Sequence, residues 1–195
     1  MFTIIGEADY TQDIRKSVFR ARAVAIASED DAKDQLARLS EPGANHNCWA
    51  FRLGQIYRFS DDGEPSGTAG KPILQAIDGQ EMDRLLVVVT RWFGGTLLGS
   101  GGLIRAYGGT AAACLREASR QELIETIDLG IRTSFSDLAL VRARIEAAEN
   151  ATIRDEQFLA DGAEFTARLP VKDAERLAQM LTDQTSGRIR IAWPD

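Results

Sequence analysis

Two glycine-rich runs constrain the fold of this chain more than any other feature of its sequence. They occupy residues 58–73 and 87–109, read RFSDDGEPSGTAGKPI and VVVTRWFGGTLLGSGGLIRAYGG, and hold three and seven of the 17 glycines. Glycine lets a ligand or another backbone approach closely and adopts positive φ, but it loses more conformational freedom on folding than any other residue. Clustered glycines therefore indicate a purpose, and we expect the functional site there.

The length and composition of the chain indicate a globular protein. Its 195 residues are 44% hydrophobic and 27% charged, which suits two domains, predicted at 1–124 and 125–195. No run approaches the length of about 18 apolar residues that a membrane helix needs, and the N-terminal sequence has no signal-peptide pattern. We therefore expect a cytoplasmic protein without a membrane partner, in which Cys48 and Cys114 are reduced and buried.

The charge pattern bears on the choice of partner. The formal net charge is −6, which argues against indiscriminate binding to phosphate backbones because that affinity comes mainly from Lys and Arg. Residues 1–124 carry 14 basic and 16 acidic side chains, for a net charge of −2, and residues 125–195 carry 9 and 13, for a net charge of −4. The first domain is thus the better candidate for an anionic partner.

Local signals in the first domain predict strands and helices. Ser28 and Asp31 form a capping-box pattern at a helix start, Pro42-Gly43 ends that helix, and the apolar run in 83–93 predicts a buried strand. The expected elements are a strand at 16–28, a helix at 29–39, a hairpin of strands 46–53 and 56–60, a helix at 67–77, a strand at 83–93 and a helix at about 101–119. The last helix is expected to bury one apolar face, which consists of Leu103, Ile104, Ala111, Leu115 and Ala118.

The second domain gives a simpler pattern. A strand, a helix, two strands that turn at Asp161-Gly162, a helix and a final strand follow one another, which is the ferredoxin-like βαββαβ order. The expected bounds are 127–135, 138–149, two strands within 152–169, 172–184 and 188–193. The fold class is therefore predicted to be α+β.

The side chains that could carry catalysis are few. His46 is the only histidine, which excludes a multi-histidine metal site, and we expect it to be a hydrogen-bonded residue at a strand end. Asp61, Asp62 and Glu64 could hold Mg²⁺, but an Asp-Asp-Gly sequence followed by Glu-Pro is also turn chemistry. We predict a polar site at these four residues, with no catalytic residue, metal or cofactor.

Neither glycine run matches a known phosphate-binding motif. A P-loop would need glycine where Pro65 stands and Ser or Thr where Pro72 stands, and the dinucleotide fingerprint would need glycine at Ile104.

A more general anion site is still predicted. A strand ends, glycines expose backbone amides, and a helix begins near Ser100, so that its N-terminus favours an anion. Gly99 and Gly101 flank this start, and Lys71, Arg91 and Arg105 could add charge. The alternative is that the glycines merely form a tight corner between the strand and the helix.

Three motifs also resemble those of the YigZ/IMPACT family. They are HNCWAFR at 46–52, RFSDDGEPSGTAGKPIL at 58–74, and VVVTRWFGG with LGSGGLIRAYGG within 87–109. The resemblance covers most of residues 15–120 and implies that the first domain has the fold of the second domain of ribosomal protein S-five, with about four strands covered by helices on one side. Two departures from the family pattern are Leu97, where a lysine is common, and Trp92 in place of tyrosine.

The resemblance implies a role in translation, and three hypotheses follow. A non-catalytic binding or regulatory protein would hold RNA, the ribosome or a regulatory protein partner through one face. That face would consist of Lys71, Arg91, Trp92, Phe93, Gly94, Gly95, Arg105 and Tyr107. The alternative is a phosphoryl-transfer enzyme that resembles GHMP kinases in fold. In the third hypothesis the glycine runs present a surface to a protein partner or to the second domain, with no ligand.

Overall fold

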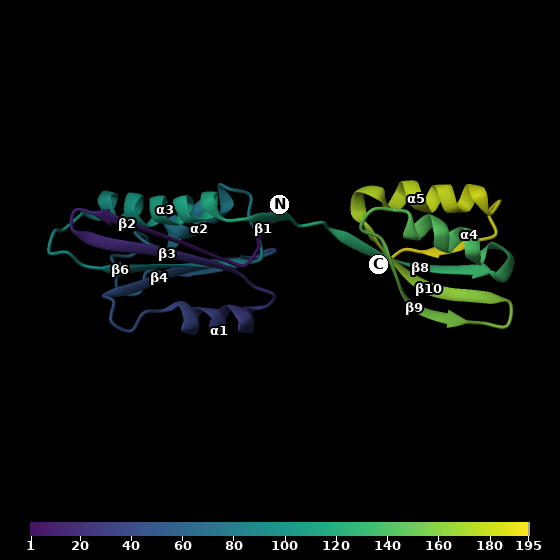
Figure 1. The fold of residues 1–195 in the computed structure, drawn as a ribbon, viewed down its shortest axis with the longest axis horizontal. Helices are drawn as coiled ribbons and strands as arrows, with labels where there is room; N and C mark the ends of the chain where they lie inside the picture. Colours follow the sequence, from purple (N-terminus) through teal and green to yellow (C-terminus); the bar gives the residue numbers. More distant parts are fainter. Residues whose placement is uncertain (195) are drawn as a thin grey trace. The chain divides into compact units, whose positions relative to one another are not determined.

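The computed structural model describes residues 1–194, and the chain divides into two compact units. The first unit comprises Met1–Leu123 and the second begins at Ile124. Each unit has its own antiparallel sheet and its own hydrophobic core (Figure 1). The protein therefore belongs to the α+β class.

A five-stranded antiparallel sheet forms the middle layer of the first unit, in the order β2-β3-β6-β4-β5. Its strands are β2 (Glu7–Ile14), β3 (Ser17–Ala25), β4 (His46–Leu53), β5 (Ile56–Ser60) and β6 (Leu85–Trp92). The central strand β6 is buried along both faces, as its apolar run predicts. Both faces of the sheet therefore need a covering layer.

Three helices provide these layers (Figure 1). Helix α1 (Glu29–Leu39) packs on one face, and α2 (Gly70–Asp78) and α3 (Ser100–Glu117) pack on the other. This arrangement differs from the single covered face and the roughly four strands that the resemblance implied.

Strand β6 explains the difference. Because successive side chains of a strand point to opposite faces, Val87 and Val89 enter the core beneath α2 and α3, while Leu86 and Val88 enter the core beneath α1. Without α1, Leu86 and Val88 would lie in water at a cost of about 1.5–3 kcal/mol for each side chain.

The first turn of α1 confirms the capping prediction. The Ser28 hydroxyl accepts a hydrogen bond from the Asp31 backbone N–H at 3.1 Å, and the Asp31 carboxylate accepts one from the Ala27 N–H at 2.8 Å. These bonds satisfy amides that have no partner within the helix. The expected bounds of this helix, 29–39, are confirmed, as are those of the hairpin strands β4 and β5.

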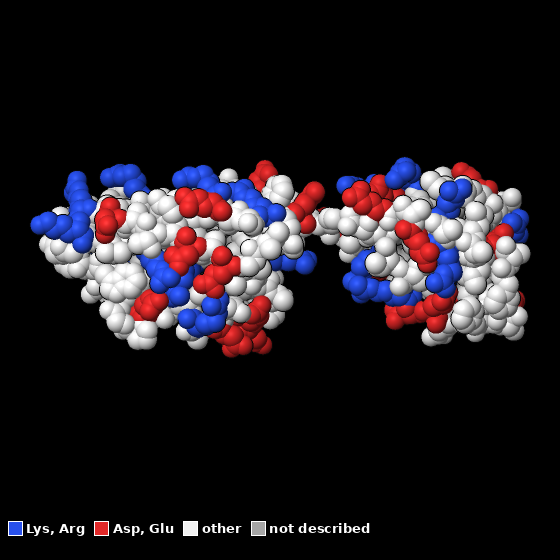
Figure 2. All heavy atoms as spheres, viewed as in Figure 1, with Lys and Arg blue, Asp and Glu red and all other residues white. Residues whose placement is uncertain are grey.

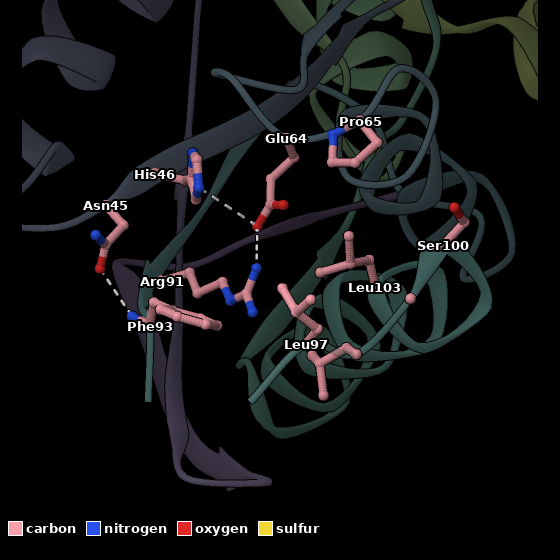
Figure 3. Close-up of a pocket in the computed structure, with 11 residues that line it drawn as sticks. Asn45, His46, Glu64, Pro65, Arg91, Phe93, Leu97, Ser100 and Leu103 are labelled. Carbon is pink, nitrogen blue, oxygen red and sulfur yellow. Dashed lines mark hydrogen bonds and ion pairs between the residues drawn. The ribbon is translucent and has the colours of Figure 1, made fainter. Parts of the chain in front are cut away.

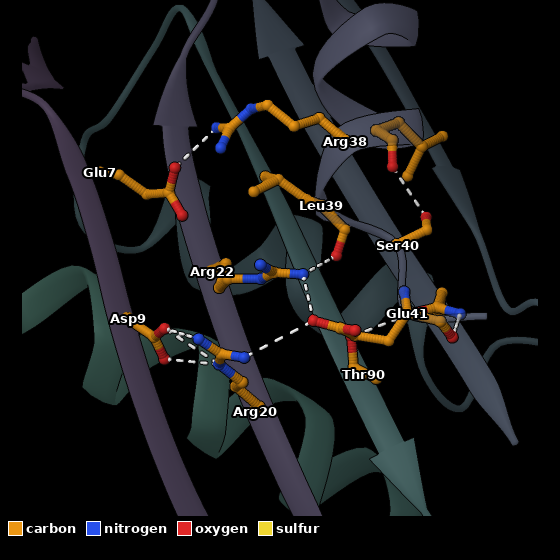
Figure 4. Close-up of polar contacts among 11 residues, drawn as sticks. Glu7, Asp9, Arg20, Arg22, Arg38, Leu39, Ser40, Glu41 and Thr90 are labelled. Atoms are coloured by element: carbon orange, nitrogen blue, oxygen red, sulfur yellow. Dashed lines mark hydrogen bonds and ion pairs between the residues drawn. The ribbon is translucent and has the colours of Figure 1, made fainter. Parts of the chain in front are cut away.

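Arginines join the end of α1 to the sheet (Figure 4). Arg22 of β3 donates hydrogen bonds to the Leu39 carbonyl oxygen and, at 2.9 Å, to the Glu41 carboxylate. Arg38 of α1 donates to the Glu7 carboxylate of β2 at 2.6 Å. Partly exposed ion pairs of this kind add little stability, so the fully buried Leu39 side chain contributes most of the attachment.

Three strands were not expected from the sequence, namely β1 (Phe2–Ile4), β2 and β7 (Arg120–Glu122). Strands β1 and β7 pair with each other in a separate antiparallel ribbon. A strand of three residues shows too little alternation of apolar and polar side chains to be distinguished from a loop in the sequence.

The second unit contains β8 (Thr126–Ser134), α4 (Phe135–Glu146), β9 (Thr152–Phe158), β10 (Gly162–Pro170), α5 (Val171–Gln184) and β11 (Arg190–Ala192). Its antiparallel sheet has the order β11-β8-β10-β9, and α4 and α5 lie together on one face of it (Figure 1). The core between them includes Leu129, Ile131 and Phe165. The expected order of six elements is confirmed.

Helix ends and one helix face were predicted less well. Helix α2 begins at Gly70 rather than 67, because residues 61–69 form a loop, and α4 begins at Phe135 rather than 138. The prediction that Ile104 lies on the buried side of α3 was wrong, since Ile104 is 42% exposed. Within residues 1–194, no helix combines the length and apolar character needed to cross a membrane.

The close approach at Gly94 yields a stability prediction. A Cβ atom there would lie 1.9 Å from the Lys16 carbonyl oxygen, a backbone atom of the β2–β3 turn. We expect Gly94→Ala to lower the free energy of unfolding by about 3 kcal/mol, because the backbone must shift to make room.

Gly109→Ala in α3 is the matched control. A Cβ atom at Gly109 meets nothing within 4 Å, and alanine is the better helix former by about 0.5–1 kcal/mol. Urea denaturation should therefore move in opposite directions for the two variants. Equal stability of both variants would contradict the close packing of Gly94.

Candidate functional site

A cavity of about 440 Å³ opens at the end of the first unit where β4 begins and β6 ends (Figure 3). Its polar lining comes from Asn45, His46, Glu64, Arg91 and Ser100. The remaining lining residues are Pro65, Phe93, Leu97, Leu98, Gly99 and Leu103. Both glycine-rich runs thus contribute to one cavity.

Asp61 organises the first glycine-rich run. Its carboxylate accepts hydrogen bonds from the backbone N–H groups of Gly67, Ala69 and Gly70 at 2.8–2.9 Å. Burial by itself raises the pKa of Asp61, but the three N–H donors outweigh it, and the net pKa is lowered. Asp61 therefore fixes the loop that leads into α2.

His46 and Asp62 are joined at the edge of the cavity. The His46 Nδ1 atom lies 2.7 Å from the Asp62 carbonyl oxygen, and the Asp62 carboxylate accepts a bond from the Asn47 N–H at 2.5 Å. A carbonyl oxygen only accepts, so His46 Nδ1 carries a proton and donates this bond. The expectation of a hydrogen-bonded histidine at a strand end is confirmed.

A buried ion pair forms the floor of the cavity. The Glu64 Oε1 atom accepts hydrogen bonds from Arg91 Nη1 at 2.6 Å and from the Tyr107 hydroxyl at 2.7 Å. The Glu64 and Arg91 side chains are 5% and 6% exposed, and His46 Nε2 lies 3.8 Å from the same oxygen. Removing one member of such a pair leaves an uncompensated buried charge, so each residue depends on the other.

Two aromatic rings hold the Arg91 guanidinium. Its central carbon lies 5.3 Å from the ring centres of Phe19 and Phe93. Phe19 is fully buried, whereas Phe93 is 44% exposed at the cavity mouth, where its backbone N–H donates to Asn45 Oδ1 at 2.7 Å. Phe93 therefore offers a ring face to a ligand while it also covers Arg91.

The second glycine-rich run places a helix N-terminus at the rim. Gly99 precedes α3 with a φ of 70° and provides no side-chain cap. The first bond of the helix runs from the Leu103 N–H to the Gly99 carbonyl at 2.9 Å, so the N–H groups of Ser100, Gly101 and Gly102 have no helical partner. An uncapped helix start favours an anion, and anion binding at this helix start stays a prediction.

Exposed cations lie near this rim. Arg105 Nη1 comes within 3.6 Å of the position of a Cβ atom on Gly101, so Arg105 lies along the first turn of α3. Arg15 and Lys16 form the β2–β3 turn, and Figure 2 shows Lys and Arg side chains gathered at that end of the unit. Lys71, on the first turn of α2, is also exposed, and none of these four side chains enters an ion pair within residues 1–194.

The predicted face is only partly assembled. Arg91 is engaged by Glu64, and Tyr107 is fully buried beneath the cavity. Trp92 is half-buried and does not line the cavity, because it follows Arg91 on the strand and points to the opposite face. Gly94 and Gly95 form the loop beyond β6. The binding roles of these residues stay predictions.

Sequence reasoning missed the ion pair and several lining residues. The lining residues Asn45, Leu98 and Leu103 gave no chemical signal of their own.

Cys48 and Cys114 are free and buried, as expected, and burial raises the pKa of each thiol to about 12. In the part of the chain that the structure describes, no group of three or more His, Cys, Asp or Glu residues is arranged to hold a metal ion.

Two family models match this architecture. The Impact N-terminal domain matches residues 15–115, and the domain of unknown function DUF1949 matches residues 131–188. The first match covers more than half of the chain, so the chain belongs to the IMPACT family, as its motifs indicated.

Similar proteins match most of this chain. An IMPACT family member of Thermus thermophilus is 43% identical over 181 residues, which cover 90% of this chain and 97% of the relative. The IMPACT family member YigZ of Escherichia coli is 33% identical over 152 residues, 74% of each chain. The crystal structure of a hypothetical protein matches with a TM-score of 0.71 and 28% identity, over 100% of this chain and 97% of that one. The protein is therefore a homologue of YigZ.

The hydrogen bonds of Asp61 give a prediction about pH. Its pKa is lower in the folded than in the unfolded protein, so the ionised carboxylate contributes stability above the unfolded pKa of about 3.9, and that stability is lost as the pH falls. We expect Asp61→Asn to lower the free energy of unfolding at pH 7 by about 1–2 kcal/mol, with a smaller difference at pH 3.

Urea denaturation of both proteins at the two pH values measures this difference. Asp34→Asn, at an exposed position of α1, is the control and should change little at either pH. A difference for Asp61→Asn that is the same at pH 3 and pH 7 would contradict the assignment.

Proposed function

We propose that this protein is a non-catalytic binding protein linked to translation, and that its first unit binds single-stranded RNA at the cavity. One observation carries the proposal. A cavity with a polar floor and an exposed aromatic ring lies directly beside an uncapped helix N-terminus. A nucleotide has the matching parts, namely a flat base with a polar edge and a phosphate.

The contacts available to a base support this proposal. Phe93 is 44% exposed, and stacking of a base on an aromatic side chain is worth about 1–3 kcal/mol. Leu97 and Leu103 supply apolar surface on the other side of the cavity. An unstacked base of a single strand can enter such a cavity, whereas a base within a duplex cannot.

The contacts available to the backbone also support it. The free N–H groups at the start of α3 lie at the cavity, and Arg105 is exposed on the same turn. Arg15 and Lys16 are exposed on the turn whose backbone packs against Gly94. Phosphate contacts of this kind position the nucleic acid, while contacts to the base give specificity. The overall net charge of −6 is compatible with a local basic rim because the Debye length is only about 8 Å at physiological ionic strength.

The fold supports a translation link by analogy. We propose that the first unit has the fold of the second domain of ribosomal protein S-five and that the second unit is ferredoxin-like. The strand order β11-β8-β10-β9, with both helices on one face, supports the second assignment. A shared fold does not by itself determine function, so the proposal rests on the residues of the cavity.

Phosphoryl transfer is the less supported alternative. It needs a carboxylate for a metal ion and another to position the nucleophile. Asp61 is engaged by three backbone amides, Asp62 by the Asn47 amide, and Glu64 by Arg91 and Tyr107. The same contacts explain these three acids as parts of the scaffold.

A charge-reversal variant tests RNA binding. We expect Lys16→Glu combined with Arg105→Glu to weaken binding of a fluorescently labelled single-stranded RNA at least about tenfold at physiological salt. The slope of log affinity against log salt should fall by about 0.7 for each phosphate that no longer meets a cation. Fluorescence anisotropy over a range of salt concentrations measures both quantities.

The control makes the same change in charge elsewhere. Arg116, at the far end of α3, and Lys172, in α5, are exposed, and Arg116→Glu with Lys172→Glu should bind RNA nearly as the wild type does. The proposal would be refuted if RNA affinity changed neither with salt concentration nor in the variant with Lys16→Glu and Arg105→Glu.

A thermal-shift measurement tests the alternative. A phosphoryl-transfer enzyme should gain apparent stability from millimolar nucleotide with Mg²⁺, because a ligand that binds the native state raises its stability. We expect no greater gain from a nucleoside triphosphate with Mg²⁺ than from the matching monophosphate without it. A gain that requires both Mg²⁺ and the γ-phosphate would favour the enzyme.

A further inference from the structure

We propose that the second unit binds a phosphate monoester between the guanidinium groups of Arg132, Arg188 and Arg190. The site is a small cavity at the end of the sheet where β8 ends and β11 begins. The inference goes beyond the proposed RNA function and does not depend on it. A terminal phosphate on an RNA and the phosphate of a small metabolite present the same group to the arginines.

The size and lining of this cavity indicate a small charged ligand. Its volume is about 190 Å³, below the roughly 300–1,000 Å³ of pockets that take whole organic molecules. All six lining residues are polar or charged: Arg132, Thr133, Ser134, Asp161, Arg188 and Arg190. Three of the nine basic side chains of residues 125–195 thus gather at one cavity, in a part of the chain whose net charge is −4.

Two of these arginines lie directly opposite each other in the sheet. Arg190 of β11 pairs with Arg132 of β8 in the antiparallel register, so their Cβ atoms lie about 4.5–5.5 Å apart on the same face. Both residues are exposed, and because Ile131 is buried beneath the helices, Arg132 points to the open face. Like charges in this position repel, and an anion between the two guanidinium groups replaces the repulsion by attraction.

The hydrogen-bond donors of this pair are largely unused. Within residues 1–194 the Arg190 guanidinium has no ion-pair partner, and Arg132 uses only Nη2, which lies 3.2 Å from both carboxylate oxygens of Asp161. The Asp161 side chain is 72% exposed on the β9–β10 turn, and such an exposed ion pair contributes little stability. A phosphate can therefore displace the Asp161 carboxylate and engage both guanidinium groups.

The third arginine, Arg188, is held in place beside them. Its Nε and Nη2 atoms donate to the two carboxylate oxygens of Asp137 at 2.9 and 2.8 Å, and the Ser134 hydroxyl donates to the same carboxylate at 3.1 Å. Arg188 Nη1 has no partner within the described residues, so its N–H groups are left for a ligand. Because Asp137 already orders the Arg188 side chain, binding loses less conformational entropy there.

The balance of charges favours a dianion. Asp137 neutralises Arg188, and once Asp161 is displaced, Arg132 and Arg190 contribute two positive charges. A phosphate monoester carries about −1.5 to −2 at neutral pH, and its three free oxygens accept from several guanidinium donors at once. Each phosphodiester of an RNA backbone carries a single negative charge. We therefore expect the site to prefer a monoester to a diester.

Titration of the full chain with methyl phosphate, followed by NMR, tests the site. We expect saturable shifts of the backbone and guanidinium signals of Arg132, Arg188 and Arg190. Dimethyl phosphate, a diester, is the matched ligand and should bind about three- to fivefold more weakly, the effect of one partly exposed ion pair. Because each signal belongs to one residue, the shifts also separate this site from the first unit.

Two variants should change the affinity in opposite directions. Arg190→Gln removes one of the two opposed charges, so methyl phosphate should bind about three- to fivefold more weakly. Asp161→Asn removes the carboxylate that competes for Arg132, so binding should become about threefold tighter. Arg154→Gln, at an exposed position of the opposite edge strand β9, is the control and should bind as the wild type does. Thermal denaturation checks that all three variants fold.

Two RNAs identify the molecule that carries the phosphate. They share one short sequence and end in a 5′-phosphate or a 5′-hydroxyl. Tighter binding of the phosphorylated strand, lost in Arg190→Gln, would assign the site to an RNA end, and equal binding of both would assign it to a phosphorylated small molecule. Together with the methyl phosphate shifts, either result supports the site.

Three results would overturn the proposal. They are shifts that rise with ligand without saturation, equal affinities for methyl and dimethyl phosphate, and an Arg190→Gln variant that binds methyl phosphate as the wild type does. None of them bears on RNA binding at the cavity of the first unit, which the changes at Lys16 and Arg105 test separately.

Discussion

The ion pair between Glu64 and Arg91 is the constraint on which the candidate site depends. Both side chains are almost fully buried, and burial of a charge is tolerated only with a partner and further hydrogen bonds. The pair joins three separate parts of the first unit: Glu64 belongs to the loop after β5, Arg91 to the end of β6, and Tyr107 to α3. These three parts converge on one carboxylate oxygen, Oε1 of Glu64, at the floor of the cavity.

The glycine-rich runs allow these parts of the unit to converge mainly because their backbone can pack closely and adopt positive φ. A side chain at Gly70 would collide with the backbone of Ser60, 2.7 Å away, and one at Gly94 would collide with Lys16. Gly99 adopts positive φ where the chain enters α3. The runs therefore bring loops together and expose amides. The ion pair of the floor comes from Glu64, between two glycines of the first run, and from Arg91, which precedes the glycines of the second.

Local signals predicted the parts of the fold that depend on neighbours in sequence. Ser28 with Asp31 located the start of α1, and the apolar run of β6 indicated a strand buried on both faces. The ribbon of β1 and β7 depends instead on pairing across about 120 residues, which no local pattern records. In the site, the sequence indicated His46, Glu64 and Arg91 as candidate residues by their type and position. Their mutual contacts could not be predicted, because an arginine beside exposed glycines is expected to face solvent. In the structure, the Glu64 carboxylate and the Phe19 ring hold the Arg91 side chain in the interior.

The ribbon also determines where the first unit begins and ends. Phe2 pairs with Glu122, and the Leu123 N–H donates to the Met1 carbonyl oxygen at 2.9 Å. The two ends of the unit are therefore neighbours in space. A unit whose ends meet can be inserted into a loop of another protein without strain on either chain. The pairing of its two ends thus closes the first unit on itself, and all residues of the cavity lie between those ends.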